Sequence, residues 1–138
     1  MAYTTINKST AHFDGKVYLG SSSAVTVSGL EFQPDWIWIK ARNTSSYNPE
    51  VYDSARGVHK SLATASSGAE YSSSTTVTAF NSDGWTMGNN HAGINNNGTT
   101  FVAWNWKAGG SPLPSGISGA SSADVWLLNL SLIHISEP

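Results

Sequence analysis

The chain has no cysteine, and this absence removes two kinds of site. None of its 138 residues is Cys, so neither a disulfide framework nor a thiolate metal site can form. Charge is also scarce, because Asp, Glu, Lys and Arg make up only 12% of the residues and the net charge is -2. Nucleic-acid-binding domains and polybasic membrane surfaces need clustered basic residues. We therefore expect no nucleic-acid partner and no membrane insertion.

Long apolar runs are missing as well. The first eleven residues contain no apolar segment of the signal-peptide kind, and no stretch after them is long enough to span a bilayer. The abundance of Ser, Thr, Asn and Gly is typical of an extracellular or particle-surface β protein, and the 11% of aromatic residues allows a buried core. Such a composition without a leader is explained by assembly in a cytoplasm followed by release on lysis.

The clearest structural signal in the sequence is the stretch 32–42. After Pro34, the residues Trp36 and Trp38 alternate with Ile37 and Ile39. Alternation of aromatic and β-branched residues with period two predicts a β-strand. Because both of its faces are apolar, this strand is expected to be central and covered on both sides.

A second stretch, 99–107, alternates in the same way, with Val102, Trp104 and Trp106 on one face. Four of the six tryptophans fall in these two predicted strands, which places the hydrophobic core there, since large aromatic residues in strands are usually buried. The predicted core residues are Trp36, Ile37, Trp38, Ile39, Phe80, Val102, Trp104 and Trp106.

The rest of the chain predicts short strands separated by turns. Strands are expected at 16–20, 24–28, 50–54, 58–64, 75–80 and 85–88, and a hairpin is expected at Asn81–Gly84, where Asp83-Gly84 would supply positive φ angles. No segment keeps a 3.6-residue apolar period. Short strands with turn residues every eight to twelve positions predict an all-β fold, an antiparallel β-sandwich of the jelly-roll kind.

The composition also divides the chain. Residues 1–110 are expected to form the sandwich domain, and 111–122, rich in Gly, Ser and Pro, to form a linker. Residues 123–129 are either the first strand of a following unit or a last strand that returns to this one. Residues 130–138, Leu-Ser-Leu-Ile-His-Ile-Ser-Glu-Pro, resemble a translated sequencing adapter, with a short edge strand as the alternative.

Four segments together resemble a known family. They are Phe32–Asn43, Val51–Val58, Ala79–Gly88 and Phe101–Gly110, in that order and spacing. This set is similar to a domain of unknown function that is common in phage structural proteins, especially from marine viral metagenomes.

That resemblance implies a concanavalin A-like, laminin-G-like jelly roll on a tail fibre or another virion-surface protein. The implied location is the phage particle, and the implied partners are other virion or tail proteins and host surface glycans. The oligomeric state stays open, with a trimer as one alternative within a tail fibre. The family has no established catalytic residues, so the resemblance assigns none here.

Arg56 is the first candidate ligand-binding residue. It follows Asp53 by three positions at the end of a predicted strand. A guanidinium at this spacing can hold a turn through a charge-assisted hydrogen bond to the carboxylate, or it can bind an anionic sugar.

Aromatic residues near turns are the other candidates for ligand binding. Trp85, Tyr47 and Tyr71 lie close to predicted turns, where an exposed ring can stack on a sugar. The competing interpretation is burial in the core, which is usual for large aromatic side chains.

No cofactor is expected, apart from the alternative of calcium. Asp83 and Asn81 could contribute oxygen ligands to such an ion, although hairpin formation explains the same residues. His12, His59 and His91 are scattered, with no two at the spacing of a zinc site.

Three functions therefore stay open. The first is a non-enzymatic virion-surface module that recognises glycans or neighbouring virion proteins through its loops. The second is a carbohydrate-active enzyme, which requires a pair of carboxylates that the sequence does not place together. The third is a purely structural spacer.

Overall fold

The computed structural model describes residues 8–108. The predicted linker 111–122, the segment 123–129 and the last nine residues all lie outside the described part. Within it, the helical elements are a 3-10 turn, η1 (Ser9–Ala11), and one helical turn, α1 (Ala92–Asn95). No helix in this range has the length and apolar character needed to cross a membrane.

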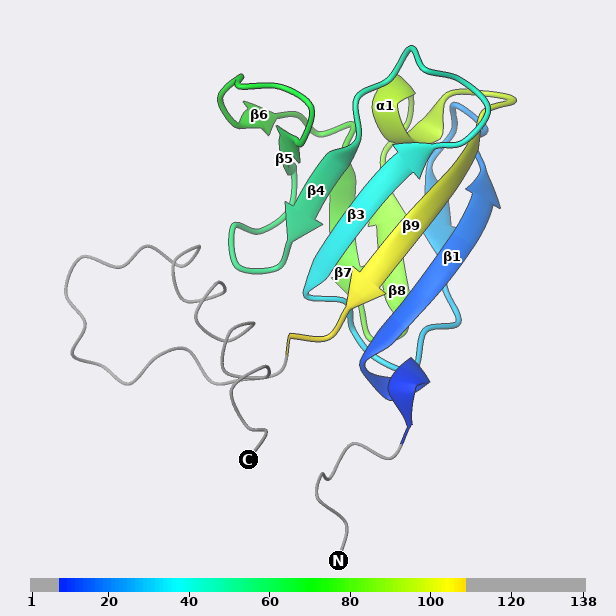
Figure 1. Cartoon of the computed structure of the whole chain (residues 1–138), viewed down its shortest axis with the longest axis vertical. Coiled ribbons are helices and arrows are strands. Elements are labelled where there is room, and N and C mark those ends of the chain that lie inside the picture. Colours follow the sequence, from blue (N-terminus) through cyan, green and yellow to red (C-terminus); the bar gives the residue numbers. More distant parts are fainter. Residues whose placement is uncertain (1–7, 109–138) are drawn as a thin grey trace, which may run out of the picture. The chain divides into compact units, whose positions relative to one another are not determined.

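Nine strands form two antiparallel sheets, which confirms the predicted all-β antiparallel sandwich (Figure 1). The larger sheet has the order β1-β9-β3-β4-β5-β6 and the smaller one the order β2-β8-β7. The bounds are β1 (Phe13–Leu19), β2 (Val25–Val27), β3 (Trp36–Ala41), β4 (Glu50–Asp53), β5 (Lys60–Ala63), β6 (Tyr71–Ser72), β7 (Val77–Asn81), β8 (Gly84–Met87) and β9 (Thr100–Trp106).

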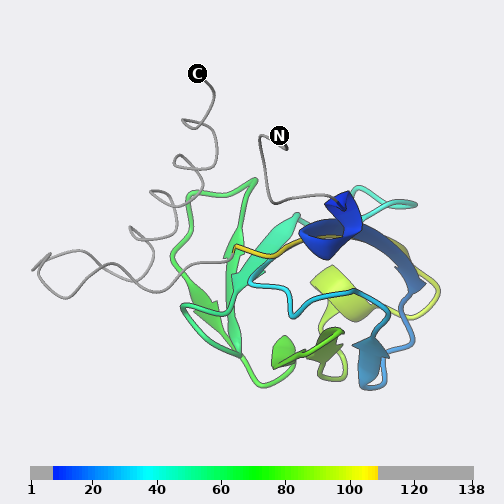
Figure 2. The same cartoon turned by 90° about the horizontal axis from the view of Figure 1, so that it is seen from below.

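The core lies between the two sheets and is closed at one end by α1, which is seen between the layers in Figure 2. From the larger sheet, Ile37 and Ile39 are fully buried, as the sequence predicted. The smaller sheet contributes Val77, Trp85 and Met87, which are also fully buried. The remaining members of the core cluster are Val27, Ala41, Tyr52, Ile94, Phe101 and Ala103, with Phe80 half-buried against it.

The predicted core position of four tryptophans is wrong. Trp36, Trp38, Trp104 and Trp106 are only half-buried, as is Val102. The alternation in β3 points Ile37 and Ile39 toward the smaller sheet, so its tryptophans must point to the opposite side. Two packed sheets are separated by about 10 Å, and bulky side chains such as Trp85 and Tyr52 already occupy that space.

Those tryptophans pack on one another across the outer side of the larger sheet. The register of β3 with β9 places Trp38 opposite Trp104 and Trp36 opposite Trp106. On the other edge of β9, Phe13 of β1 lies opposite Trp106. Ring centroids in these three pairs lie 5.3, 4.6 and 4.9 Å apart, with planes tilted by 46–58°. We call these five residues the outer aromatic face.

The predicted hairpin is present but uses different chemistry. β7 and β8 are joined by Ser82 and Asp83, with Asn81 opposite Gly84. Gly84 is not among the described residues with positive φ, and neither is Asp83. Its glycine is instead required by space, because a Cβ at position 84 would lie 1.9 Å from the Val27 carbonyl oxygen. Gly84 is therefore required by the close approach of β2 in the smaller sheet, and the conformation of the turn does not require it.

Candidate functional site

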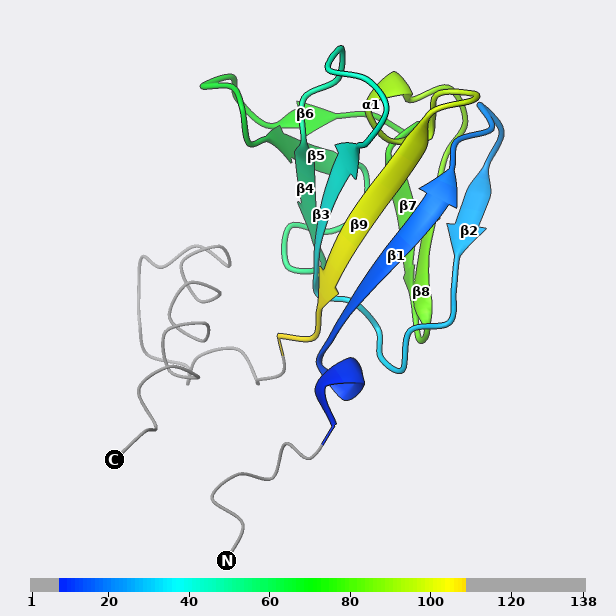
Figure 3. The ribbon, with the colours of Figure 1, turned by 45° about the vertical axis from the view of Figure 1, so that its right-hand side comes forward.

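Three polar loops gather at the end of the sandwich where β1 and β3 finish. They connect β1 to β2 (residues 20–24), β3 to β4 (42–49) and β8 to β9 (88–99), and they lie together at the top of Figures 1 and 3. We call this region the loop end. Its exposed polar side chains are Ser21, Ser23, Arg42, Asn43, Ser45, Ser46, Asn48, Asn89, Asn90 and Asn97.

Asn95 holds two of these loops together from the inside. It is fully buried, yet each polar atom of its amide has a partner. The Oδ1 atom accepts a hydrogen bond from the Ser21 backbone N–H at 3.0 Å. The Nδ2 atom donates to the carbonyl oxygens of Ser23 and Gly88. A buried, fully satisfied amide specifies one arrangement of the surrounding loops.

The third loop is tied to the same structure by Asn43. Its Nδ2 donates to the Gly98 carbonyl at 3.3 Å, and its Oδ1 accepts from the Thr100 backbone N–H at 3.1 Å. The loops also approach one another closely, since a Cβ at Gly20 would lie 2.2 Å from the Asn96 carbonyl oxygen. The loop end is therefore a connected polar surface instead of three independent loops.

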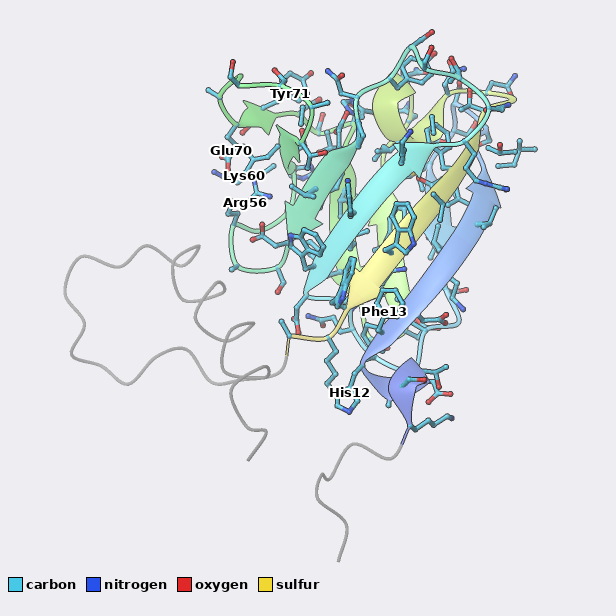
Figure 4. The ribbon with its side chains drawn as sticks, viewed as in Figure 1. His12, Phe13, Arg56, Lys60, Glu70 and Tyr71 are labelled. Atoms are coloured by element: carbon cyan, nitrogen blue, oxygen red, sulfur yellow. The ribbon has the colours of Figure 1, made fainter. Side chains whose placement is uncertain are left out.

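An exposed aromatic ring stands beside this surface. Tyr71, in β6, is 53% exposed and stacks on the His91 ring, with centroids 5.9 Å apart and planes 25° from parallel. Figure 4 shows Tyr71 at this end of the molecule. Tyr71 therefore contacts His91 with its ring and still exposes about half of its surface to solvent.

His91 is fixed in turn by Glu50. The His91 Nε2 atom lies 3.0 and 3.1 Å from the two Glu50 carboxylate oxygens, and both side chains are largely buried. The Tyr52 hydroxyl donates to the same carboxylate. This chain of contacts runs from a core strand to the exposed Tyr71 ring, so the ring is preorganised by its support.

Two tyrosines beneath this site, Tyr18 and Tyr52, are weaker acids than usual. Burial raises the pKa of the Tyr52 phenol well above its usual 10.0, and the Glu50 negative charge raises it further. The Tyr18 pKa is raised by the same two causes in the same order, and its hydroxyl donates to the Ile94 carbonyl at 2.8 Å. Both phenols therefore stay protonated and act as hydrogen-bond donors at neutral pH.

The structure separates the three predicted aromatic ligand residues. Trp85 directly follows the hairpin turn, but its side chain is not exposed there. It is fully buried and donates its indole N–H to Asn105 Oδ1 at 3.0 Å. The prediction that it could stack on a sugar is therefore wrong. Tyr47 is half-buried against the core cluster. Only Tyr71 keeps a large exposed ring.

Arg56 is engaged within its own chain. Its guanidinium contacts Asp53, Glu70 and the Val51 carbonyl oxygen, and only 12% of its side chain is exposed. The Asp53 carboxylate also accepts from the Arg56 backbone N–H at 2.7 Å. These contacts match the predicted turn-holding pair, and they place Arg56 and Glu70 on the side of the larger sheet near β5 and β6 (Figure 4).

The two predicted calcium ligands lie in the β7–β8 hairpin. The Asn81 amide nitrogen donates to Thr86 Oγ1 at 3.0 Å, and the Asp83 carbonyl oxygen accepts from the Leu30 backbone N–H. Among residues 8–108, no three acidic or histidine side chains come together in a way that could hold a metal ion.

His91 is the site residue that sequence reasoning missed. Its neighbours along the chain are Asn90 and Ala92, so no motif distinguishes it, and its partner Glu50 is 41 residues away. Only the pairing of distant strands and loops brings His91, Glu50 and Tyr71 together. The outer aromatic face had a visible signal, because both faces of the β3 sequence are apolar.

Comparison with known proteins gives one match. A family model described as a domain of unknown function (DUF7483) matches residues 8–125. This range includes every described strand and continues past β9. No curated protein and no solved structure matches the chain.

Proposed function

Because the chain belongs to the DUF7483 family of domains of unknown function, its role must be argued from its geometry, and we propose that it is a non-enzymatic recognition module that binds glycans at its loop end. The observation that carries the proposal is the Tyr71 ring, half-exposed and stacked on His91. Sugars are bound by an aromatic surface together with hydrogen-bonding groups, and the loop end offers both.

The polar half of the site comes from exposed amides. Asn48, Asn89 and Asn90 are exposed in the loops beside Glu50 and His91. An Asn side chain offers two donors and one acceptor with two lone pairs, so it can satisfy sugar hydroxyls in either sense. Fixing such groups on a rigid sandwich lowers the entropic cost of binding. This division between scaffold and recognition loops is common in β-sandwich proteins.

The same geometry favours binding over catalysis. Glu50, which supports Tyr71 through His91, is already bound by Tyr52 and His91. Glu70, which precedes Tyr71 in the chain, is paired with Arg56 and Lys60. Glycosidases need two carboxyl groups about 5–10 Å apart at the scissile bond. A carbohydrate-active enzyme remains the alternative, and release of reducing ends from a bound oligosaccharide would establish it.

We further propose that the module belongs to the surface of a phage particle, where its neighbours are other virion or tail proteins. The four segments that resemble phage structural proteins support this. A purely structural spacer is the second candidate function, favoured by the outer aromatic face, which offers apolar area for packing against a neighbour.

The experiment is a glycan array probed with the purified chain, followed by titration of each hit. Wild-type protein should bind a restricted set of glycans, and Tyr71→Ala should weaken binding at least tenfold. Phe13→Ala is the matched control, because Phe13 is an exposed aromatic residue (40% exposed) in β1, on a different surface. An array without hits, or equal binding by Tyr71→Ala, would overturn the proposal in favour of the spacer.

A further inference from the structure

Strand β1 is an edge strand with an unusual distribution of side chains. Its outward residues Phe13, Val17 and Leu19 are 40, 62 and 60% exposed, and they are three of the six large apolar residues that are exposed in the described range. The charged residues Asp14 and Lys16 lie on the opposite face of the sheet, the face that turns toward the core. Inward-pointing charges are one device that protects a solvated edge from pairing, but in β1 the two charges are of opposite sign and neutralise each other in an ion pair at 2.9 Å.

The backbone of β1 has a free side. The His12 carbonyl accepts from the Lys107 N–H and the Gly20 N–H donates to the Thr99 carbonyl, so the even-numbered residues between them turn toward β9. Phe13, Gly15, Val17 and Leu19 then turn their N–H and C=O groups to the opposite side. Among the described residues, no strand pairs with β1 on that side.

Neither backbone conformation nor space among residues 8–108 requires a glycine at position 15. Its φ angle is not positive, and an added Cβ would meet nothing within 4 Å. A glycine inside a strand costs about 0.5–1 kcal/mol relative to alanine. Glycines at such positions often mark the close approach of another backbone.

The geometry points to a second copy of this chain, paired with β1 through β1 in an antiparallel arrangement that has Gly15 on the two-fold axis. In this register Gly15 faces Gly15 of the other copy, and Phe13 faces Val17 in both directions. The free N–H and C=O groups of these odd-numbered residues are the ones that face each other, so about six backbone hydrogen bonds can form. The contact is self-complementary, as a two-fold interface requires.

Charge selects this register over its neighbours. With Gly15 on the axis, each Asp14 lies opposite Lys16 of the other copy, which gives two ion pairs of opposite charge. Shifting the register by two residues would instead place Lys16 opposite Lys16. Within one chain Asp14 and Lys16 already contact each other at 2.9 Å and retain 26–28% exposure, so both remain accessible to a partner. Opposite charges placed directly across two strands stabilise the pairing, and like charges oppose it.

The dimer would join two six-stranded sheets into one continuous sheet. Because a two-fold axis perpendicular to the sheet preserves its faces, both outer aromatic faces would lie on the same side. Phe13 of one copy would then contact Val17 of the other, which covers two of the three exposed apolar residues of the edge.

Charge reversal in the full chain tests the register directly. Lys16→Asp puts acidic residues opposite acidic residues, and Asp14→Lys puts basic opposite basic. Sedimentation equilibrium should show a dimer for wild type and a dissociation constant at least about tenfold higher for either variant alone. An equal mixture of the two variants restores opposite charges in both pairs, so it should dimerise as wild type does.

The mixture also separates the interface from folding. Lys16 donates to the Gly29 carbonyl at 2.8 Å, so Lys16→Asp can lower the melting temperature, but that loss would not be repaired by mixing with Asp14→Lys. A wild-type chain that stays monomeric up to its solubility limit overturns the proposal. Variants that self-associate as strongly as wild type also overturn it, because the dimer would then use another surface.

Discussion

Trp38 and Trp104 lie directly opposite each other on β3 and β9, with their ring centroids 5.3 Å apart, on the side of the larger sheet that faces away from the core. Both are half-buried, and Trp38 also packs against Trp36, with ring centroids 6.4 Å apart. They therefore stabilise the sheet as a cross-strand pair and not as interior residues.

This arrangement predicts moderate, coupled losses of stability. Trp38→Ala and Trp104→Ala should each cost less than the about 3–5 kcal/mol typical of a buried tryptophan. The double variant should lose about 0.5–1.5 kcal/mol less than the sum, since an aromatic pair contributes that much beyond area burial. Urea unfolding of the four proteins measures this, and strict additivity would show that the two rings do not interact.

Arg56 should be important for stability. Arg56→Ala leaves the largely buried Asp53 carboxylate without its guanidinium partner, and an uncompensated charge of this kind costs about 3 kcal/mol. Lys60→Ala is the matched control, because the Lys60 ammonium group pairs with the exposed Glu70 and its loss should change stability by less than about 1 kcal/mol. Thermal unfolding that shows equal effects of the two changes would contradict this role.

The buried phenols predict a loss of stability in alkali. The unfolded chain releases the Tyr52 proton near the usual pKa of 10.0, whereas the folded protein holds it to higher pH. The contribution is therefore complete below pH 10 and is lost as the pH rises toward the folded pKa. Tyr52→Phe has no proton to release, so its unfolding free energy should fall less steeply above pH 10. Identical slopes for both proteins would contradict the assignment.

Two glycines in strands should respond in opposite ways to alanine. Gly84→Ala forces a Cβ against the Val27 carbonyl oxygen and should cost at least about 1–3 kcal/mol. Gly15→Ala meets no atom within 4 Å and should be neutral or stabilising by about 0.5–1 kcal/mol. The comparison is made by urea unfolding at concentrations too low for self-association, and a destabilising Gly15→Ala would contradict the open space at that position.

Sequence periodicity predicted the strands well and the faces poorly. The alternation of tryptophan and isoleucine located β3, and turn residues located most of the others. Alternation alone does not say which face turns inward when both are apolar, and the size of Trp favoured the wrong one. The position of Trp85 next to a turn likewise predicted exposure, whereas the ring lies in the core and its indole N–H is satisfied by Asn105, 20 residues away.

The candidate site was even less visible before the structure was known. Tyr71 is predicted as a ligand-binding ring because it lies close to a predicted turn. The orientation of the ring depends on His91 and Glu50, which no spacing in the sequence connects to it. Long-range pairing of β4 with the loop before β9 creates that arrangement. Local patterns can therefore suggest an exposed ring, whereas its supporting contacts come only from the fold.

Mapping a bound oligosaccharide by NMR tests the central claim most directly. Backbone amide shifts of the full chain would be followed during titration with the strongest array hit. The account predicts the largest changes at Tyr71, His91 and the loops 20–24, 42–49 and 88–99, with little change along β1. Changes centred on Phe13 and the tryptophans of the outer aromatic face, or no localised change at all, would contradict recognition at the loop end.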